Sequence, residues 1–461
     1  MTTALPAKAL PDGPLVTFYG DDFTGSSASM EVLAFAGLPT VLFLEPPTAE
    51  RLRDFAGYRA IGIAGTARSR SPDWMDEHLP FVFRLLAGLG APVLHYKVCS
   101  TFDSAPHVGS IGRAAEIGIE LLQPSWVPMV VADPGMGRFQ SFGHLFALAG
   151  DTGYRLDRHP TMSRHPTTPM DEADLNRHLA RQTTRRCGLV DFLHAKRGAA
   201  DAQLDSVLKA GAQIVSLDVL DSETLIEAGR LIWERGGRPV FGLGSQGFEA
   251  ALVAYWRERG LLPPDVSQER PGAVDRIACV SGSVSPTTAD QVAHALAHGF
   301  EGIRLDAALA VDEAAWDGEL GRATEAALRV LGEGRDPLVF TATGPDDPAV
   351  ARFNAALAGG GVPPGTVNER MGSGMGRVLR TVIERAGLRR VVISGGDTSG
   401  RAAAMLGIDA LTAIAPLDPG APLCRAHGPA GGLAGLEVAL KGGQVGRPDF
   451  FVAVRSGGRA S

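Results

Sequence analysis

The chain has 461 residues, of which 45% are hydrophobic and 21% are charged, a balance typical of globular proteins. Its formal net charge of −7 argues against a nucleic acid or an anionic membrane as the main partner, but a local basic pocket could still hold an anionic small molecule. The length exceeds one ordinary domain core, so two or three domains are expected.

The cysteines are scattered along the chain without CxxC spacing, so neither a disulfide framework nor a zinc site is predicted. Reduced thiols favour a cytoplasmic protein. The opening stretch, MTTALPAKALPDGP, lacks the apolar core of a signal peptide. No apolar run reaches the roughly 18 residues of a membrane span.

The first half of the chain alternates short apolar runs with amphipathic stretches, which predicts a parallel sheet covered by helices on both faces. Helices are expected over 26–37, 73–89 and around 108–122. The predicted strands are 15–19, 40–44, 59–65, 92–98 and 126–133. Residues 134–186 show no clear periodicity, and there we expect a long excursion with a short helix from near Asp171.

The alternation returns with strands 213–219 and 238–244 and stops at LLPPDVSQERPGAVD, a polar, proline-bearing stretch over 261–275. It restarts with strands 276–282, 302–306, 337–344 and 390–396. The prediction is an α/β protein of two domains with mainly parallel sheets and an inter-domain cleft. The N-terminal domain is expected over 1–262, a linker over 263–274 and the C-terminal domain over 275–461.

Ligands of doubly wound sheets bind beyond the carboxyl ends of the strands, so the residues that follow each strand are the candidates for a site. GDDFTGSS places Asp21 and Asp22 after the first strand, with Gly25 leaving the backbone bare beside them. Helix capping accounts for one aspartate but not for two. The alternative is a carboxylate that faces a hydroxyl or a magnesium ion, for proton transfer or metal binding.

A second cluster lies in YKVCSTFDS, which carries Lys97, Ser100, Thr101 and Asp103 at the end of another strand. Together with Arg68, which follows the strand over 59–65, these residues could bind a carboxylate and several hydroxyls, as a small sugar acid requires. A solvated loop with a serine or aspartate turn is the structural alternative. Because lysine is rare in this chain, Lys97 favours the functional interpretation.

The C-terminal domain carries glycine-rich turns between strands and helices, and bare N–H groups at a helix start can hold phosphate. Two such turns, in CVSGSVSPTTADQV and VVISGGDTSGRAAAMLG, favour a nucleotide site, and LKGGQVGRPDFF adds a third. The candidate residues are Ser281, Gly282, Ser283, Gly395, Gly396, Asp397, Thr398, Gly442 and Gly443.

Two other classes of function remain open at this point. GLGSQG (242–247) matches the G-x-G-x-x-G pattern of dinucleotide-binding proteins, which would indicate an NAD(P)-dependent oxidoreductase. The strand expected about 20 residues later, ending in an acid for a ribose, is replaced by the proline-bearing linker. A non-catalytic sugar-acid sensor is the other alternative, since two-domain α/β clefts also serve as binding proteins.

Taken together, these motifs resemble the four-carbon acid sugar kinases, a family once catalogued as a domain of unknown function. GDDFTGSS, YKVCSTFDS, HPTTPM (165–170), SGSVS, GGDTSG and LKGGQVGRPDFF each resemble a family string, and the match runs nearly end to end. YKVCSTFDS is similar to a string of the 3-oxo-tetronate branch. The stretch after it, APHVGSIG, departs from that branch. A branched acid such as 3-oxo-isoapionate is therefore a candidate substrate in addition to 3-oxo-tetronate, threonate and erythronate.

The resemblance implies a kinase that transfers phosphate from ATP, with magnesium, to the terminal hydroxyl of a small sugar acid in carbohydrate catabolism. It places the acid on the N-terminal domain, at Asp22, Arg68, Lys97 and Ser100, and the nucleotide on the C-terminal domain. Asp22 or Asp21 would take the proton from the attacking hydroxyl. The resemblance assigns no metal ligands, names no nucleic-acid or membrane partner and leaves a homo-oligomer open.

Overall fold

The computed structural model describes residues 9–165, 167–264, 266, 271–429, 433 and 435–458. The chain forms two compact α/β units, a first unit of Met1–Val41 with Pro46–Val266 and a second unit of Leu42–Glu45 with Ser267–Ser461. The predicted linker over 263–274 lies partly outside the described residues, at 265 and 267–270.

The sheet of the first unit is parallel throughout its described strands, in the order β3-β1-β4-β11-β5-β10-β9. Its central strands are almost wholly buried apolar runs, as expected for a sheet covered on both faces. The bounds are β1 Val16–Gly20, β3 Ala60–Ala64, β4 Val93–Lys97, β5 Val127–Val130, β9 Cys187–Val190, β10 Ile214–Leu217 and β11 Val240–Gly244. These strands confirm the predicted ones, and β9 is an addition.

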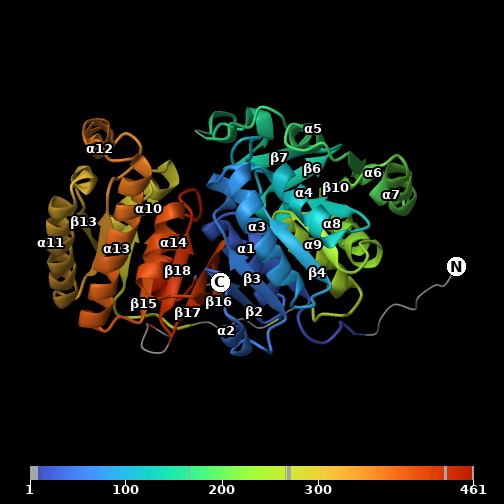
Figure 1. Ribbon diagram of the computed structural model, residues 1–461. Coiled ribbons are helices and arrows are strands. Elements are labelled where there is room, and N and C mark those ends of the chain that lie inside the picture. The colour runs from blue at the N-terminus through green and yellow to red at the C-terminus, as the bar shows by residue number, and fades with distance from the viewer. Residues whose placement is uncertain are drawn as a thin grey trace. The chain divides into compact units, whose positions relative to one another are not determined.

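Helices cover both faces of this sheet (Figure 1). On β4, His95 bonds Glu249 of α9, which also accepts from Ser29 of α1, whereas the next residue, Tyr96, packs on Phe83 of α3. Because successive side chains of a strand point to opposite faces, α1 and α9 lie on one face and α3 on the other, with α4 beside α3. The bounds are α1 Phe23–Phe35, α2 Ala49–Arg53, α3 Pro72–Ala87, α4 Ile111–Leu122, α5 Leu175–Leu179, α6 Phe192–Lys196, α7 Ala200–Lys209, α8 Ser222–Arg230 and α9 Gly247–Glu258.

Two details of the first unit differ from the prediction. The excursion over 134–186 contains an antiparallel sheet of β6 (Arg138–Ser141), β7 (His144–Ala149) and β8 (Thr152–Arg155), and its short helix begins at Leu175 rather than near Asp171. Helix α1 begins at Phe23, so Gly25 belongs to its first turn. Asp22 is its N-cap, and the capped helix therefore starts directly beside the paired aspartates.

The sheet of the second unit runs in the order β13-β14-β12-β15-β18-β17-β16. It is parallel from β13 to β18, while β17 and β16 are antiparallel, and the end of β2 (Thr40–Phe43) pairs with β16. The mainly parallel sheet is thus confirmed, with antiparallel strands that were not predicted. The bounds are β12 Ala278–Ser281, β13 Phe300–Arg304, β14 Asp336–Phe340, β15 Arg390–Ser394, β16 Ala410–Asp418, β17 Ala421–His427 and β18 Glu437–Lys441.

The helices of the second unit also divide between two faces. One buried core joins Val292 of α10 and Phe450 of α15 to Cys279 and Val392 of the sheet. Helices α11, α13 and α14 pack side by side over the other face (Figure 1). The bounds are α10 Pro286–Ala297, α11 Glu313–Gly332, α12 Pro348–Gly359, α13 Pro364–Ala386, α14 Gly396–Met405 and α15 Phe450–Ser456. Within the described ranges, no helix is long and apolar enough to cross a membrane.

Each unit contains a strand whose following helix lies on the face opposite to those of its neighbours. In the first unit this is β1, which leads to α1, while its neighbours β3 and β4 lead to α3 and α4. In the second it is β12, which leads to α10, while β14 and β15 lead toward α13 and α14. Such topological switch points open a crevice beyond the strand ends where ligands bind. The topology therefore places one candidate site on each unit.

Candidate active site

Two loops of the first unit, after β1 and after β3, bring Asp21, Asp22 and Arg68 into one ion-pair cluster. Arg68 Nη2 donates to Asp21 Oδ1 at 2.6 Å and to Asp22 Oδ1 at 2.9 Å. The Arg68 backbone N–H also donates to the Asp21 carbonyl at 2.9 Å. The sequence predicted Arg68 as a partner of a substrate carboxylate. In the structure its charge is already shared between two carboxylates of the protein.

Asp22 is a helix cap whose carboxylate also stays partly exposed. Its Oδ1 accepts from the Gly25 N–H at 3.0 Å and caps α1, and its Oδ2 accepts from Thr24 Oγ1 at 3.2 Å. Its side chain is 23% exposed, whereas that of Asp21 is only 2% exposed. Of the two neighbouring carboxylates, only Asp22 therefore has an appreciable surface open to a bound molecule.

Lys97 supplies the cation of this site that is not already paired. The residue is 2% exposed and lies at the end of β4, in register with Gly20 of β1. Among the described residues its ammonium has no hydrogen bond and no ion pair within 4.0 Å. A Cβ built on Gly25 would lie within 3.0 Å of both Lys97 Nζ and Asp22 Oδ1, so the bare glycine makes room for these two groups.

The loop after β4 is internally bonded rather than solvated. Thr101 Oγ1 donates to Asp103 Oδ1 at 2.7 Å and lies 3.0 Å from Cys99 Sγ. Asp103 and Thr101 are buried, and Ser100 between them and Lys97 is half-buried. The side chains of Thr101 and Asp103 thus support the loop from within, while Ser100 remains a candidate for direct contact with a ligand.

The carboxylates of this cluster titrate differently although they lie close together. The pKa of Asp21 is raised to about 6. Burial and the negative charge of Asp22 raise it, and together they outweigh the positive charge of Arg68, which lowers it. Burial acts in the same direction on Asp103, but there Arg68 and the bonds from Cys99 and Thr101 outweigh it and lower the pKa. Asp103 therefore stays ionised while Asp21 titrates in mildly acidic solution.

Arg138 and His165 belong to this neighbourhood, although the sequence prediction did not include them. The charge of His165 helps to lower the pKa of Asp103. Arg138 acts electrostatically on Cys99, and its Nε is buried without a hydrogen-bond partner among the described residues. The signal available for His165 was HPTTPM, which resembles a family string but gave no role to any single residue.

The interpretation of GLGSQG as a dinucleotide site is wrong. A Cβ on Gly244 would lie within 3.0 Å of the Val130 carbonyl, and one on Gly247 within 3.0 Å of the Ala132 carbonyl. A Cβ on Gly242 would likewise lie within 3.0 Å of the ring of Phe248. These glycines let β11 and α9 pack against β5. Other atoms of the protein fill the space beside each glycine, so no room is left for a pyrophosphate.

The glycine-rich turns of the second unit come together at the ends of β12, β15 and β18, which are neighbours in the sheet. A Cβ on Gly282 would lie within 3.0 Å of Thr398 Oγ1, and one on Gly443 at 2.5 Å from Ser283 Oγ. Gly395 has a φ of 121°, which favours glycine, and α14 starts directly after it. The three predicted loops thus form one cradle of closely packed backbone. The side chain of Asp397 lies outside the described part of the structure.

Below this cradle, Ser281, Ser394 and Lys441 occupy matching positions on the three strands. Ser281 Oγ and Ser394 Oγ are buried without hydrogen-bond partners among the described residues. Lys441 Nζ donates to Thr288 Oγ1 at 3.2 Å and to the Gly442 carbonyl at 3.0 Å, and burial lowers the pKa of Lys441 to about 7. Unpaired hydroxyls and a buried cation beneath glycine turns fit a polyphosphate group.

Comparison with known proteins agrees with one candidate site on each of the two units. Residues 16–252 match a sugar-binding N-terminal domain, and residues 278–451 match a nucleotide-binding C-terminal domain. The chain is 49% identical over 456 residues to 3-oxo-isoapionate kinase of Paraburkholderia graminis, covering 99% of this chain and 97% of that relative. It is 31% identical over 457 residues to 3-oxo-tetronate kinase of Cupriavidus necator, covering 97% and 98%.

A protein of known structure from Salmonella typhimurium LT2 shares the fold, with a TM-score of 0.76 at 23% identity over 95% of this chain and 98% of that one. The matched sugar-binding and nucleotide-binding domains, together with the two kinase relatives, define a phosphotransferase that acts on a sugar-derived substrate. The chain belongs to the four-carbon acid sugar kinase family, the ATP-dependent kinases of small sugar acids. The predicted family, fold class and kinase activity are confirmed, and neither the oxidoreductase nor the sensor alternative stands.

Proposed function

We propose that this chain phosphorylates 3-oxo-isoapionate, or a branched sugar acid closely like it, in carbohydrate-acid catabolism. The much higher identity to the 3-oxo-isoapionate kinase than to the 3-oxo-tetronate kinase supports this choice. The stretch after STFDS, which departs from the 3-oxo-tetronate branch, packs on the site. The Gly109 N–H donates to the Arg70 carbonyl at 2.9 Å, and a Cβ on Gly109 would lie within 3.0 Å of the Arg68 carbonyl.

The observation that carries the catalytic assignment is the asymmetry within the acid–cation cluster. Asp21 is buried against Arg68, while Asp22 is held in place by the start of α1 and remains partly exposed. Asp22 is therefore our candidate for the general base, and Arg68 holds the two carboxylates in position. Lys97, with Ser100 beside it, is the candidate partner of the substrate carboxylate, because its ammonium has no protein partner among the described residues.

On the second unit we assign the phosphates of ATP to Ser281, Gly282 and Ser283, to Gly395, Gly396 and Thr398, and to Gly442 and Gly443. ATP supplies the phosphoryl group. As the substrate oxygen bonds to the terminal phosphorus, the bond from that phosphorus to the bridging oxygen breaks and the hydroxyl proton passes to Asp22. Among the described residues no three His, Cys, Asp or Glu side chains gather to hold a metal ion. We propose that Mg²⁺ enters with the nucleotide, where it would neutralise the charge of the phosphates.

A coupled assay of ADP release tests the substrate. The panel contains 3-oxo-isoapionate, 3-oxo-tetronate, and D- and L-threonate and erythronate. We expect kcat/KM for 3-oxo-isoapionate to exceed that for 3-oxo-tetronate by about tenfold or more, the range that one changed pocket contact gives. ATP turnover without any acid is the blank. If kcat/KM is equal for the two 3-oxo acids, or higher for 3-oxo-tetronate, the chain would instead be assigned to the 3-oxo-tetronate kinases. Turnover of none of the acids would refute the proposed substrate class.

A further inference from the structure

A buried group of polar side chains in the first unit has no part in the assignments above. Ser29 Oγ of α1 donates to Glu249 Oε2 of α9 at 2.9 Å, and His95 Nδ1 of β4 lies 2.6 Å from Glu249 Oε1. All three residues are 0% exposed. We call Ser29, Glu249 and His95 the buried triad. It connects α1, which Asp22 caps, with β4, which ends at Lys97.

Every side-chain nitrogen and oxygen of the buried triad has a partner. The second ring nitrogen of His95, Nε2, lies 3.1 Å from the Gly244 carbonyl, which can only accept, so Nε2 carries a hydrogen. One further proton lies between His95 Nδ1 and Glu249 Oε1, so the pair has no net charge whichever atom holds it. The ring of Phe248 stacks on the imidazole at 4.4 Å and 12° and fixes its plane. The triad therefore has one bonded arrangement.

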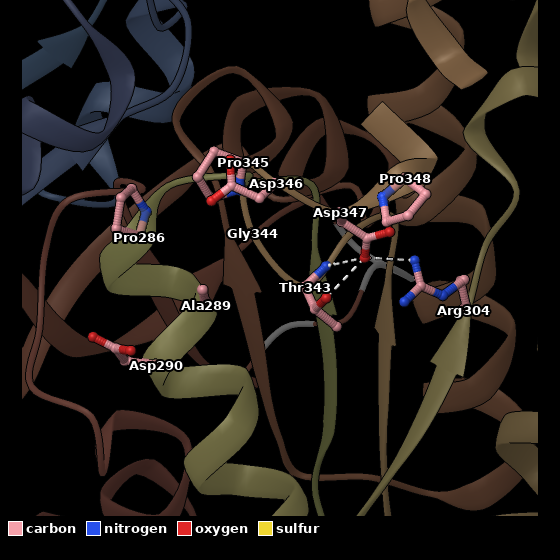
Figure 2. Close-up of a pocket in the computed structure, with 10 residues that line it drawn as sticks. All are labelled: Pro286, Ala289, Asp290, Arg304, Thr343, Gly344, Pro345, Asp346, Asp347 and Pro348. Atoms are coloured by element: carbon pink, nitrogen blue, oxygen red, sulfur yellow. Dashed lines mark hydrogen bonds and ion pairs between the residues drawn. The ribbon is translucent and has the colours of Figure 1, made fainter. Parts of the chain in front are cut away.

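A carboxylate held by a hydroxyl and a cation also occurs in the second unit, but there the cation reaches water. Figure 2 shows Asp347 accepting from the N–H and Oγ1 of Thr343, at 2.8 Å each, and from Arg304 at 2.7 Å. The side chain of Arg304 is 40% exposed and keeps much of its hydration. The buried triad gives up all hydration, and apolar residues of the same volume often stabilise a core equally well. Its presence therefore favours a role in fixing geometry.

The buried triad is in register with the candidate active site. Alternate residues of a strand lie on the same face, so His95 and Lys97 share one face of β4. Ser29 lies one turn after Gly25 in α1, and Gly25 is the residue whose missing Cβ makes room for Lys97 Nζ. One helix turn is about 5.4 Å long and two strand residues are about 6.7 Å long. Helix α1 therefore meets β4 at two matching points, once at Lys97 and once at the triad.

A second connection runs from the buried triad to the backbone of Lys97. The Gly244 carbonyl, which accepts from His95, also accepts from the Val98 N–H at 2.7 Å. The Lys97 carbonyl in turn accepts from the Asp21 N–H at 2.9 Å. Gly244 belongs to GLGSQG, so the string that resembles a dinucleotide motif supplies the carbonyl that anchors this strand end.

We propose that Ser29, Glu249 and His95 are positioning residues for the sugar acid. They do not touch the substrate. They hold Lys97 and the capped start of α1 at the spacing that binding of the acid and attack by its hydroxyl require. This inference rests on the proposed function, because it takes Lys97 as the partner of the substrate carboxylate and Asp22 as the general base. It gives α9 and GLGSQG a part in catalysis that needs no contact with a ligand.

The direct test is Ser29→Ala, which removes the bond between α1 and Glu249 and leaves the other two members of the triad in place. For the acid with the highest kcat/KM in the ADP-release assay, we expect kcat/KM to fall about tenfold. This is less than the roughly 10²-fold cost of a 1 Å displacement, because the contact of α1 with Lys97 remains. The Kd for ADP should not change, since the residues assigned to the nucleotide lie on the second unit.

Ser216→Ala is the matched control for this variant. Ser216 is also 0% exposed and accepts from Gln140 Nε2 at 2.7 Å, but it lies on β10, which is a neighbour of neither β1 nor β4 in the sheet. This control should lose a similar amount of thermal stability and keep the kcat/KM of the wild type.

Glu249→Gln tests whether the bonds of the triad are what matters. Glutamine has the shape of glutamate, its amide N–H can donate to His95 Nδ1, and its Oε1 can accept from Ser29. Every bond of the triad and its zero net charge are then kept, so kcat/KM should stay near the wild-type value. Glu249→Leu keeps the approximate size but none of the bonds, and it should lower kcat/KM for the acid by about 10²-fold with an unchanged Kd for ADP.

Two results would overturn the inference. The first is a lower melting temperature of Ser29→Ala and Glu249→Leu with the kcat/KM of the wild type, because the triad would then be structural only. The second is equal loss of activity in Glu249→Gln and Glu249→Leu. Lys97→Met tests the proposed function separately and should raise the KM for the acid. If that KM is unchanged, the assignment of Lys97 fails whatever the triad variants do.

Discussion

Asp22→Asn is expected to reduce kcat by about 10²–10⁴-fold, the range for loss of a positioned general base. Asparagine has the shape of aspartate and caps a helix about as well, so the bond from the Gly25 N–H that caps α1 should be kept. Arg68 keeps its bonds to Asp21. The affinity for ADP should remain that of the wild type, because every residue assigned to the nucleotide lies on the second unit. ADP release and ADP binding measure the two effects separately.

The matched control for this variant is Asp221→Asn. Asp221 also caps a helix of the first unit, α8, by accepting from the Thr224 N–H at 3.0 Å. It follows β10, which is not a neighbour of β1 in the sheet. Its substitution should leave turnover unchanged. Near-normal turnover of the Asp22→Asn variant would remove Asp22 from the mechanism, and an equal loss in both variants would assign the effect to helix capping.

Gly25→Ala is expected to lower kcat/KM by about 10²-fold, although it removes no reactive group. The added methyl would lie within 3.0 Å of Asp22 Oδ1 and at 2.5 Å from Lys97 Nζ, so both groups must move. Displacement of catalytic groups by about 1 Å costs roughly this factor. The fold should tolerate the change, because only side-chain ends are displaced and alanine stabilises a helix by about 0.5–1 kcal/mol relative to glycine. Turnover and thermal unfolding of the same preparation test both parts.

Gly318→Ala in α11 is the matched control for this substitution. It is also a helical glycine, but a Cβ there would have no neighbour within 4 Å. The Gly318→Ala variant should be slightly more stable than the wild type, and its activity should not change. Full activity of the Gly25→Ala variant would contradict the view that Asp22 and Lys97 must hold their positions at the start of α1.

The sequence could predict the parts of the fold that depend on short-range pattern. Apolar runs such as VLHYK form buried strands, and residues at their ends meet at one edge because parallel strands share a direction. The antiparallel sheet of β6 to β8 could not be predicted in this way. Its strands are short and only partly buried, as in RFQS and TGYR, so neither face carries a clear apolar alternation.

Contacts across the fold set the limit of the prediction at the site. That Arg68 would bond to both aspartates, and leave Lys97 as the unpaired cation, depends on the loop geometry after β3 and β4. Arg138, which interacts electrostatically with Cys99, lies on β6, a strand that the pattern did not show. Strand β14 lies between β13 and β12 in the sheet, and such an order is set by crossovers that leave no local signal.

The central claim is that the acid binds to the first unit and the nucleotide to the second. Amide hydrogen exchange of the full chain, measured with a non-hydrolysable ATP analogue and Mg²⁺ but without any sugar acid, tests it most directly. The account predicts slower exchange in 282–285, 395–399 and 442–445 and unchanged exchange in 21–27 and 66–70. Slower exchange around Asp21 and Asp22, with none in the glycine loops of the second unit, would contradict it.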